Sequence, residues 1–269
     1  MTSTMVAVDG GEVWADDSGG DGPALVMLHP GVGDSRIWEP VLAPLTGKYR
    51  VLRYDARGFG RSPAPTVKFS LLRDLSVVLD HFGVARAAFV GCSQGGATSL
   101  GLTLAQPERV SALVLLCPGI PGFPMTNKEE AAIFGPDKAV ELMAGFERAQ
   151  AAGDVDGFAA VMLQAWGAGG TTPTVLEQAR SAARAAIAIG DLELADPPVF
   201  DRLGEITVPA ALMVGDADYA PLVQLNRESA PRIPGCEFLL VPGMDHFPPL
   251  REPGLVLDLI TRTLARAHW

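Results

Sequence analysis

The amino-acid sequence predicts an α/β fold in which a doubly wound sheet is covered by helices on both faces. Short apolar runs recur along the chain, and segments with helical periodicity lie between them. The runs are almost continuously apolar, as is typical of strands that are buried on both faces of a parallel sheet. Alternation of such strands with helices indicates a doubly wound sheet. The six strand candidates are Ala24–His29, Arg50–Asp55, Ala87–Gly91, Ser111–Cys117, Pro209–Gly215 and Glu237–Val241.

The N-terminal segment predicts a β-hairpin at one edge of this sheet. Met5–Asp9 and Glu12–Ala15 alternate between apolar and polar residues, and they flank Gly10 and Gly11. Alternation indicates a strand with one exposed face, and a Gly-Gly pair is typical of a tight hairpin turn.

Two stretches between the strand candidates and one after the last of them predict helices of the core. Leu71–Phe82 carries apolar residues at spacings of three and four, which places them along one side of a helix. The same spacing occurs in Gln94–Ala105 and in Leu255–Ala267.

The alternation of strands and helices is interrupted between Gly119 and Asp201. This stretch has no convincing strand and contains four amphipathic segments, so we expect a helical cap at residues 120–200. Residues 1–119 and 201–269 then form the core. Because the insertion leaves from strand ends, where open α/β sheets bind ligands, we expect it to cover a substrate. The alternative is that it only stabilises the sheet edge. The four segments are Asn127–Phe134, Asp137–Ala151, Val155–Trp166 and Thr174–Ile189.

Composition excludes several classes of protein. The 269 residues are 48% hydrophobic and 19% charged, as in folded globular proteins, and the net charge is −10. A pI near 4.8 argues against nucleic acid or an anionic membrane as a partner. No apolar run is long enough to span a bilayer, and the N-terminus lacks the basic start of an export signal. We therefore expect a cytoplasmic protein.

The three cysteines, Cys92, Cys117 and Cys236, are widely spaced, odd in number and without a CxxC pair. We expect reduced, buried thiols rather than a disulfide.

Residues 89–97, FVGCSQGGA, predict a nucleophile elbow at Ser93. The motif Gly-x-Ser-x-Gly follows a strand candidate and begins a helix candidate, which is the setting of such an elbow. The nucleophile of an elbow adopts a strained backbone conformation, so side chains two positions before and after it would collide. Gly91 and Gly95 remove those side chains. The alternative is a flexible, purely structural joint.

A serine nucleophile requires a base, and the base requires a carboxylate. His246 follows the last strand candidate in the loop PGMDHFPP, and we predict it as the base. The segment MVGDADYAP offers Asp216 and Asp218 after the preceding strand. We predict Asp218 as the acid because it lies further beyond the strand end, whereas Asp216 is placed to stabilise the turn.

Two backbone N–H groups are expected to stabilise an oxyanion. The first is that of Gln94, which follows Ser93. The second belongs to the loop HPGVGDSRIW, where we predict Gly31, with Val32 as the alternative.

Five motifs in order carry a resemblance to a known family. They are a strand followed by His29, Pro30 and Gly31, and then YDARGFGRSP, VGCSQGG, GDADYAP and GMDHFP. Over about residues 5–265 the chain resembles the α/β-hydrolase superfamily, and within it the small cap-bearing esterases, 3-oxoadipate enol-lactonases and cofactor-free haloperoxidase-like hydrolases. The resemblance implies the α/β-hydrolase fold, with an eight-stranded, mostly parallel sheet flanked by helices. It also implies that the cap is inserted after the sixth strand. Many relatives have His-Gly where this chain has His29-Pro30, and proline removes an N–H from the loop.

A serine at the elbow predicts an acyl-enzyme and therefore hydrolysis of carboxylic esters or lactones. The alternative is a non-hydrolytic or C–C bond-cleaving enzyme of the same fold, such as a lyase, a cyclase or a diketone hydrolase. A further alternative is perhydrolysis, in which peroxide instead of water attacks the same acyl-enzyme. The sequence has no HExxH, GxGxxG or P-loop motif, so we expect neither a metal nor a cofactor.

The expected partner is a small, apolar ester or lactone, because the candidate cap residues are apolar. We predict that Trp38, Cys92, Phe123 and Trp166 contact it.

Overall fold

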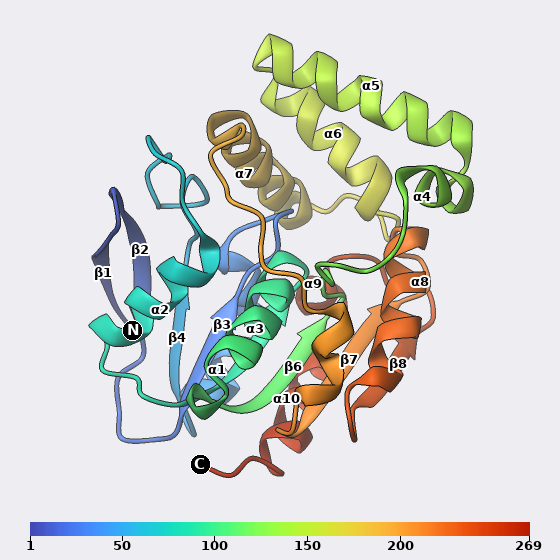
Figure 1. The fold of residues 1–269 in the computed structure, drawn as a ribbon. Coiled ribbons are helices and arrows are strands. Elements are labelled where there is room, and N and C mark those ends of the chain that lie inside the picture. The colour runs from blue at the N-terminus through green and yellow to red at the C-terminus, as the bar shows by residue number, and fades with distance from the viewer.

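A computed structural model describes all residues, 1–269, and contains one eight-stranded sheet in the order β1-β2-β4-β3-β5-β6-β7-β8 (Figure 1). All neighbours from β4 to β8 are parallel, whereas β1–β2 and β2–β4 are antiparallel. The predicted edge hairpin and the mostly parallel sheet are therefore confirmed. The strands are β1 Thr2–Val8, β2 Gly11–Asp17, β3 Ala24–Leu28, β4 Arg50–Tyr54, β5 Ala87–Cys92, β6 Val110–Leu116, β7 Ala210–Gly215 and β8 Glu237–Val241.

Burial explains why the central strands are apolar without alternation. Every residue of β5, β6 and β7 is buried, because helices cover both faces of the sheet there. In β1, by contrast, exposed and buried residues alternate toward its C-terminal end, as befits an edge strand.

The helices of the core are α1 Glu39–Thr46, α2 Leu71–His81, α3 Gln94–Ala105, α8 Ala220–Ser229, α9 Pro248–Arg251 and α10 Pro253–Leu264. Sequence periodicity predicted α2, α3 and α10, and it missed α1, α8 and the one-turn α9. In α1, Pro44 lies inside a short helix, a position that proline usually disfavours. Its buried Val41, Leu42 and Leu45 hold the helix against the core.

Four helices lie between β6 and β7 and are named here the helical insertion. They are α4 Asn127–Phe134, α5 Pro136–Ala152, α6 Val155–Trp166 and α7 Pro173–Ile189. Figure 1 shows α5 and α6 stacked away from the sheet, with α7 between them and the core.

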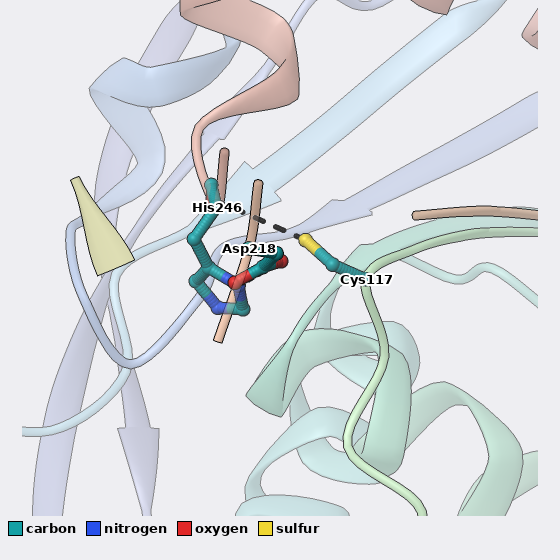
Figure 2. Close-up of side chains that lie close together, drawn as sticks. All are labelled: Cys117, Asp218 and His246. Atoms are coloured by element: carbon teal, nitrogen blue, oxygen red, sulfur yellow. Dashed lines mark hydrogen bonds and ion pairs between the residues drawn. The ribbon is translucent and has the colours of Figure 1, made fainter. Parts of the chain in front are cut away.

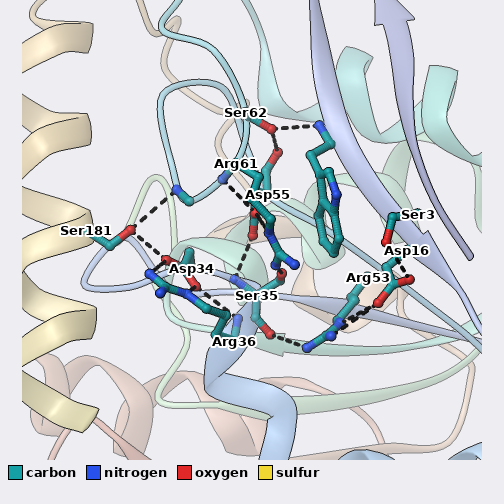
Figure 3. Close-up of polar contacts among 12 residues, drawn as sticks. Ser3, Asp16, Asp34, Ser35, Arg36, Arg53, Asp55, Arg61, Ser62 and Ser181 are labelled. Carbon is teal, nitrogen blue, oxygen red and sulfur yellow. Dashed lines mark hydrogen bonds and ion pairs between the residues drawn. The ribbon is translucent and has the colours of Figure 1, made fainter. Parts of the chain in front are cut away.

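Asp34 connects the loop after β3 to α7 of the insertion (Figure 3). Its carboxylate accepts hydrogen bonds from Ser181 Oγ at 2.6 Å and from the Arg36 guanidinium at 2.6 Å, and its backbone N–H donates to Gln178 Oε1 at 2.8 Å. Burial opposes ionisation of this carboxyl, but the hydrogen bonds from Arg36 and Ser181 outweigh it and lower the pKa of Asp34. The loop and the insertion are thereby fixed to each other by a buried charge.

The motif YDARGFGRSP forms a braced turn. Arg57 makes a buried ion pair with Asp74 at 2.7 Å, and Arg61 binds Asp55 at 2.9 Å while it stacks on the ring of Trp14. Both arginines therefore hold neighbouring segments together (Figure 3 shows Arg61 and Asp55).

All three cysteines are free thiols. Cys92 and Cys117 are buried with their Sγ atoms 3.7 Å apart, so residues distant in the sequence are neighbours in the fold. Cys236 is only half-buried, which differs from the prediction. No helix combines the length and the apolar character needed to cross a membrane.

Candidate active site

Ser93 lies on the sharp turn between β5 and α3. Its backbone has φ 49° and ψ −111°, a conformation that non-glycine residues rarely adopt. The turn leaves no room for side chains around it: a Cβ at Gly91 would collide with the backbone of Gly95, and one at Gly95 with the backbone of Leu28. The chain therefore holds Ser93 in strain at the point where a strand gives way to a helix.

The helix after Ser93 directs N–H groups toward the turn. Gln94 is the first residue of α3, and the first N–H groups of a helix have no acceptor within it. They also carry the positive end of the helix dipole. A negative charge that develops beside Ser93 is therefore favoured.

Asp218 and His246 form a buried pair at the ends of neighbouring strands (Figure 2). Asp218 follows β7 and His246 follows β8; they are 6% and 1% exposed. His246 Nδ1 lies 2.8 Å from Asp218 Oδ2 and 3.0 Å from Oδ1. Because a carboxylate accepts, Nδ1 carries the proton, and Nε2 is left to act as a base.

Asp216, the other acidic candidate, has a different role. Its Oδ1 accepts a hydrogen bond of 2.7 Å from the backbone N–H of Gly243, and this bond ties the loop after β7 to the loop after β8. The geometry therefore separates the two aspartates: Asp218 contacts the histidine, and Asp216 stabilises a turn.

Cys117 lies beside this pair and was not predicted there. Its thiol is 3.9 Å from the carbonyl oxygen of His246, and the ligand atoms of Cys117, Asp218 and His246 lie within 4.8 Å of one another (Figure 2). Burial and the adjacent Cys92 raise the pKa of the Cys117 thiol well above its usual value. Cys117 packs the loop of His246 against the end of β6.

Ser93 and His246 face a common cavity of about 450 Å³. No hydrogen bond joins the Ser93 hydroxyl to His246 in this structure, and in the absence of substrate such contacts are often loose. Most of the wall is hydrophobic. The residues lining the cavity are Gly31, Val32, Ser93, Ile120, Gly122, Phe123, Met125, Glu130, Met162, Trp166, Tyr219, Pro221, Leu222, Leu225 and His246.

Gly31, predicted as the second oxyanion donor, and Val32, its alternative, both lie on the wall of this cavity. The loop is braced from behind by His29, whose Nδ1 donates to the carbonyl oxygen of Pro30 at 2.8 Å and whose Nε2 accepts from Ala56 N at 2.9 Å. This bracing holds the backbone of the loop, whose residues Gly31 and Val32 line the cavity with Ser93.

Two of the four residues predicted to contact substrate line the cavity, and two do not. Phe123 and Trp166 are on its wall. The prediction for Trp38 is wrong, because its side chain is fully buried in the hydrophobic core. The prediction for Cys92 is also wrong: as the last residue of β5 it packs into the core against Cys117, while the turn presents Ser93 to the cavity.

Sequence reasoning missed two carboxylates near the site. Gln94 does not line the cavity with its side chain, and its Nε2 donates to Glu193 Oε1 at 2.8 Å. Burial raises the pKa of Glu193 to about 7, although the hydrogen bond from Gln94 opposes this. Glu130 of α4 lies on the cavity wall and accepts from the Tyr219 hydroxyl. Neither carboxylate carries a sequence signal, because both belong to segments that reach the site only through the tertiary fold.

Comparison with known proteins agrees with this geometry. A family model described as alpha/beta hydrolase fold matches residues 23–168, more than half of the chain. The chain belongs to the α/β hydrolase fold family. The resemblance proposed from the five sequence motifs is thereby confirmed.

Among curated relatives of this α/β hydrolase is the putative carbamate hydrolase RutD of Caulobacter segnis. The two are 36% identical over 101 residues, which span 35% of this chain and 38% of that protein. The match therefore covers well under half of the relative's length.

Two solved structures are similar over almost the full chain. One is described as "Est816 as an N-Acyl homoserine lactone degrading enzyme", with TM-score 0.77, 26% identity, and coverage of 96% of this chain and 99% of that one. The other is the enol-lactonase from Burkholderia xenovorans LB400, with TM-score 0.68, 25% identity, and coverage of 97% and 100%.

Proposed function

We propose that this α/β hydrolase is a serine hydrolase that cleaves carboxylic esters or lactones through an acyl-enzyme. One observation carries the proposal: the strained Ser93 and His246 line one cavity, and His246 is paired with the buried Asp218, so that three different strand ends contribute. Family membership and the likeness to a lactone-degrading enzyme and an enol-lactonase support the same chemistry.

The first half of the reaction acylates the serine. His246 Nε2 takes the proton of Ser93 Oγ, and the oxygen attacks the carbonyl carbon of the substrate. The negative charge on the carbonyl oxygen is stabilised by the N–H of Gln94 and by that of Gly31 or Val32. When the tetrahedral intermediate collapses, the C–O bond to the alcohol breaks, and His246 gives its proton to the departing oxygen.

The second half releases the acid. His246 removes a proton from a water molecule, whose oxygen attacks the acyl carbon and displaces Ser93 Oγ, which regains its proton from His246. An ester yields an acid and an alcohol, whereas a lactone yields a single hydroxy acid. Asp218 keeps Nδ1 protonated and stabilises the imidazolium in both halves.

The helical insertion acts in this proposal as a cap over the site. Residues 120–200 supply Phe123, Met162 and Trp166 to the wall of the cavity, and residues 1–119 and 201–269 supply Ser93 and the Asp218–His246 pair. An apolar wall of this kind favours an apolar acyl or ring group.

A panel of simple esters and lactones tests the proposal, with Ser93→Ala as the variant and Ser229→Ala as its matched control. Ser229 is buried in α8, and its hydroxyl has no hydrogen-bonding partner. We expect turnover that Ser93→Ala abolishes and Ser229→Ala leaves intact. Turnover that survives in Ser93→Ala would contradict the proposal.

An aryl carbamate belongs in the same panel. The similarity to the putative carbamate hydrolase RutD favours this second substrate class, and its carbonyl would meet the same serine. Hydrolysis of the carbamate in preference to every ester and lactone would replace the proposed substrate class and leave the role of Ser93 unchanged.

A further inference from the structure

The cavity at Ser93 has a strongly one-sided charge. Glu130 is the only acidic residue among its fifteen lining residues, and no lysine or arginine lines it. The other polar side chains are Ser93, Tyr219 and His246, and His246 already faces Asp218. A negatively charged group on a ligand would therefore find no cation to pair with.

Glu130 is held in place by the start of α4. Its backbone N–H donates to the carbonyl oxygen of Thr126 at 2.9 Å, so the residue belongs to the first turn of the helix. The positive end of the helix dipole lies at this turn. The Tyr219 hydroxyl donates to Oε1 at 3.1 Å, while Oε2 remains available to a ligand.

Tyr219 connects this carboxylate to the catalytic pair. It follows Asp218 in the chain, and its backbone N–H donates to Asp218 Oδ1 at 2.7 Å. Its ring packs against Phe134 and Trp166, with centroids 4.7 Å and 5.8 Å away. Burial and the charge of Glu130 raise the pKa of Tyr219, so the phenol stays protonated and continues to donate. Tyr219 thus contacts both Glu130 and Asp218, the partner of His246.

Two further cavities are likewise lined by acidic residues and by no basic ones. The first, of about 610 Å³, shares Glu130 and Tyr219 with the Ser93 cavity and is otherwise mostly apolar; its other charged residue is Glu147. The second, of about 430 Å³, shares Phe123 and Met125 and carries Glu129 and Glu228. Neither is lined by a lysine or an arginine. The charged side chains that line these neighbouring cavities are therefore all acidic.

We propose that Glu130 is a specificity-determining residue of this site. It favours esters or lactones whose far end carries a hydrogen-bond donor, an ammonium group most strongly, and it disfavours those that carry a carboxylate. A donor at that end binds Oε2 of Glu130, whereas a carboxylate is repelled and left unpaired in an apolar cavity. This inference rests on the proposed hydrolysis of esters or lactones at Ser93.

Matched p-nitrophenyl esters test the inference. The esters have straight acyl chains of equal length that end in a methyl, a hydroxyl, an ammonium or a carboxylate group. We expect kcat/KM of the native protein to be at least about tenfold higher for the ammonium ester than for the carboxylate ester. The difference should lie mainly in KM, because Glu130 is not a reacting group, and it should shrink as salt is added.

The variant Glu130→Gln keeps the shape of the side chain and removes its charge. We expect it to reduce the ratio of kcat/KM between the ammonium and carboxylate esters by about tenfold; both esters are measured on the same variant, so a change in its overall activity cancels from the ratio. The control is Glu141→Gln, which removes the same charge from an exposed position in α5 and should leave the ratio within about twofold.

Failure of the inference differs from failure of the proposed function. If the methyl ester is hydrolysed but the ratio is unchanged in Glu130→Gln, the inference is wrong and the hydrolase activity stands. If no ester is hydrolysed, the proposed function fails. Calorimetry then compares the affinities of Ser93→Ala for the primary amides that correspond to the ammonium and carboxylate esters. Equal binding of the ammonium and carboxylate amides would then overturn the role of Glu130.

Discussion

At the scale of single residues, the proposed chemistry depends on the different contacts of two aspartates in one turn. In GDADYAP, Asp216 and Asp218 are two positions apart, yet only Asp218 meets His246, at 2.8 Å. Asp216 instead accepts the N–H of Gly243 at 2.7 Å. Two residues of extra chain are enough to carry a carboxylate from the turn to the histidine, and this difference can be tested.

Asparagine at each position gives a matched pair of variants. In Asp218→Asn the amide can donate to Nδ1, which favours the tautomer with the proton on Nε2 and removes the base. We expect kcat to fall by about 10³–10⁴-fold. In Asp216→Asn the side-chain oxygen still accepts from Gly243, and we expect kcat within about threefold of the native value. Steady-state kinetics with a single ester measures both.

The reverse ranking of these two variants would contradict the assignment of the acid. Equal, small effects would show that His246 does not need a carboxylate partner for the reaction.

At the scale of elements, the unit β5–turn–α3 positions Ser93. Gly91 and Gly95 of this unit allow the strand, the helix and the neighbouring β3 to approach more closely than side chains permit. The strained φ of Ser93 costs about 1–3 kcal/mol and is sustained by the buried strand and helix on either side.

Two Gly→Ala variants within α3 test this unit. Gly95→Ala forces a methyl group into the backbone of Leu28, and we expect it to reduce the free energy of unfolding by at least about 2 kcal/mol. Gly101→Ala lies in the same helix, where a Cβ would meet only the Leu72 side chain at 3.8 Å. We expect it to stabilise the protein by about 0.5–1 kcal/mol. Denaturant unfolding compares them, and similar values for both would contradict the close-packing argument.

Elements were predictable from the sequence to different degrees for physical reasons. The central strands were readable because burial on both faces leaves an unbroken apolar run, as in Ser111–Cys117. The helix α1 was missed because Pro44 lies inside it, and its stability comes from tertiary packing. Helices α4–α7 were predicted from their own amphipathic patterns.

In the candidate site too, residues marked by local motifs were predictable, and residues positioned by the tertiary fold were not. Ser93, Asp218 and His246 follow strands in a fixed order, so local motifs pointed to them. Trp38 and Cys92 were misassigned because closeness in sequence to a loop or a nucleophile does not decide which way a side chain turns. Glu130 and Glu193 were missed because they reach the site across long distances in the chain.

At the scale of the whole molecule, the helical insertion and the core are held together by buried polar contacts. Asp34 is fully buried in the loop that also supplies Gly31 and Val32, and it binds α7 through Gln178 and Ser181. The loop expected to hold the oxyanion is therefore anchored to α7.

Asp34→Asn tests this connection, with Asp156→Asn as the matched control. We expect Asp34→Asn to reduce the free energy of unfolding by about 2 kcal/mol, because it removes the charge that Arg36 and Ser181 stabilise. Asp156 makes an exposed ion pair with Arg180 between α6 and α7, and its loss should cost less than about 1 kcal/mol. Denaturant unfolding at neutral pH measures both.

The pH dependence of this difference has a definite sign. The pKa of Asp34 is lowered in the folded protein. The ionised carboxylate therefore contributes fully to the free energy of unfolding above pH 3.8, the ordinary pKa of aspartate, and this contribution is lost as the pH falls below that value. The difference in the free energy of unfolding between the native protein and Asp34→Asn should therefore become smaller below about pH 4. A gap that widens on acidification would contradict the role given to Asp34.

The most direct test of the account is covalent labelling of the serine. A fluorophosphonate that is incubated with the native protein should add its mass to one peptide, and fragmentation should place it on Ser93. The label should be absent from Ser93→Ala and strongly reduced in His246→Ala, because the base that activates the hydroxyl is gone. Labelling of another residue, or undiminished labelling of Ser93 in His246→Ala, would contradict the central claim that Ser93 is a nucleophile activated by His246.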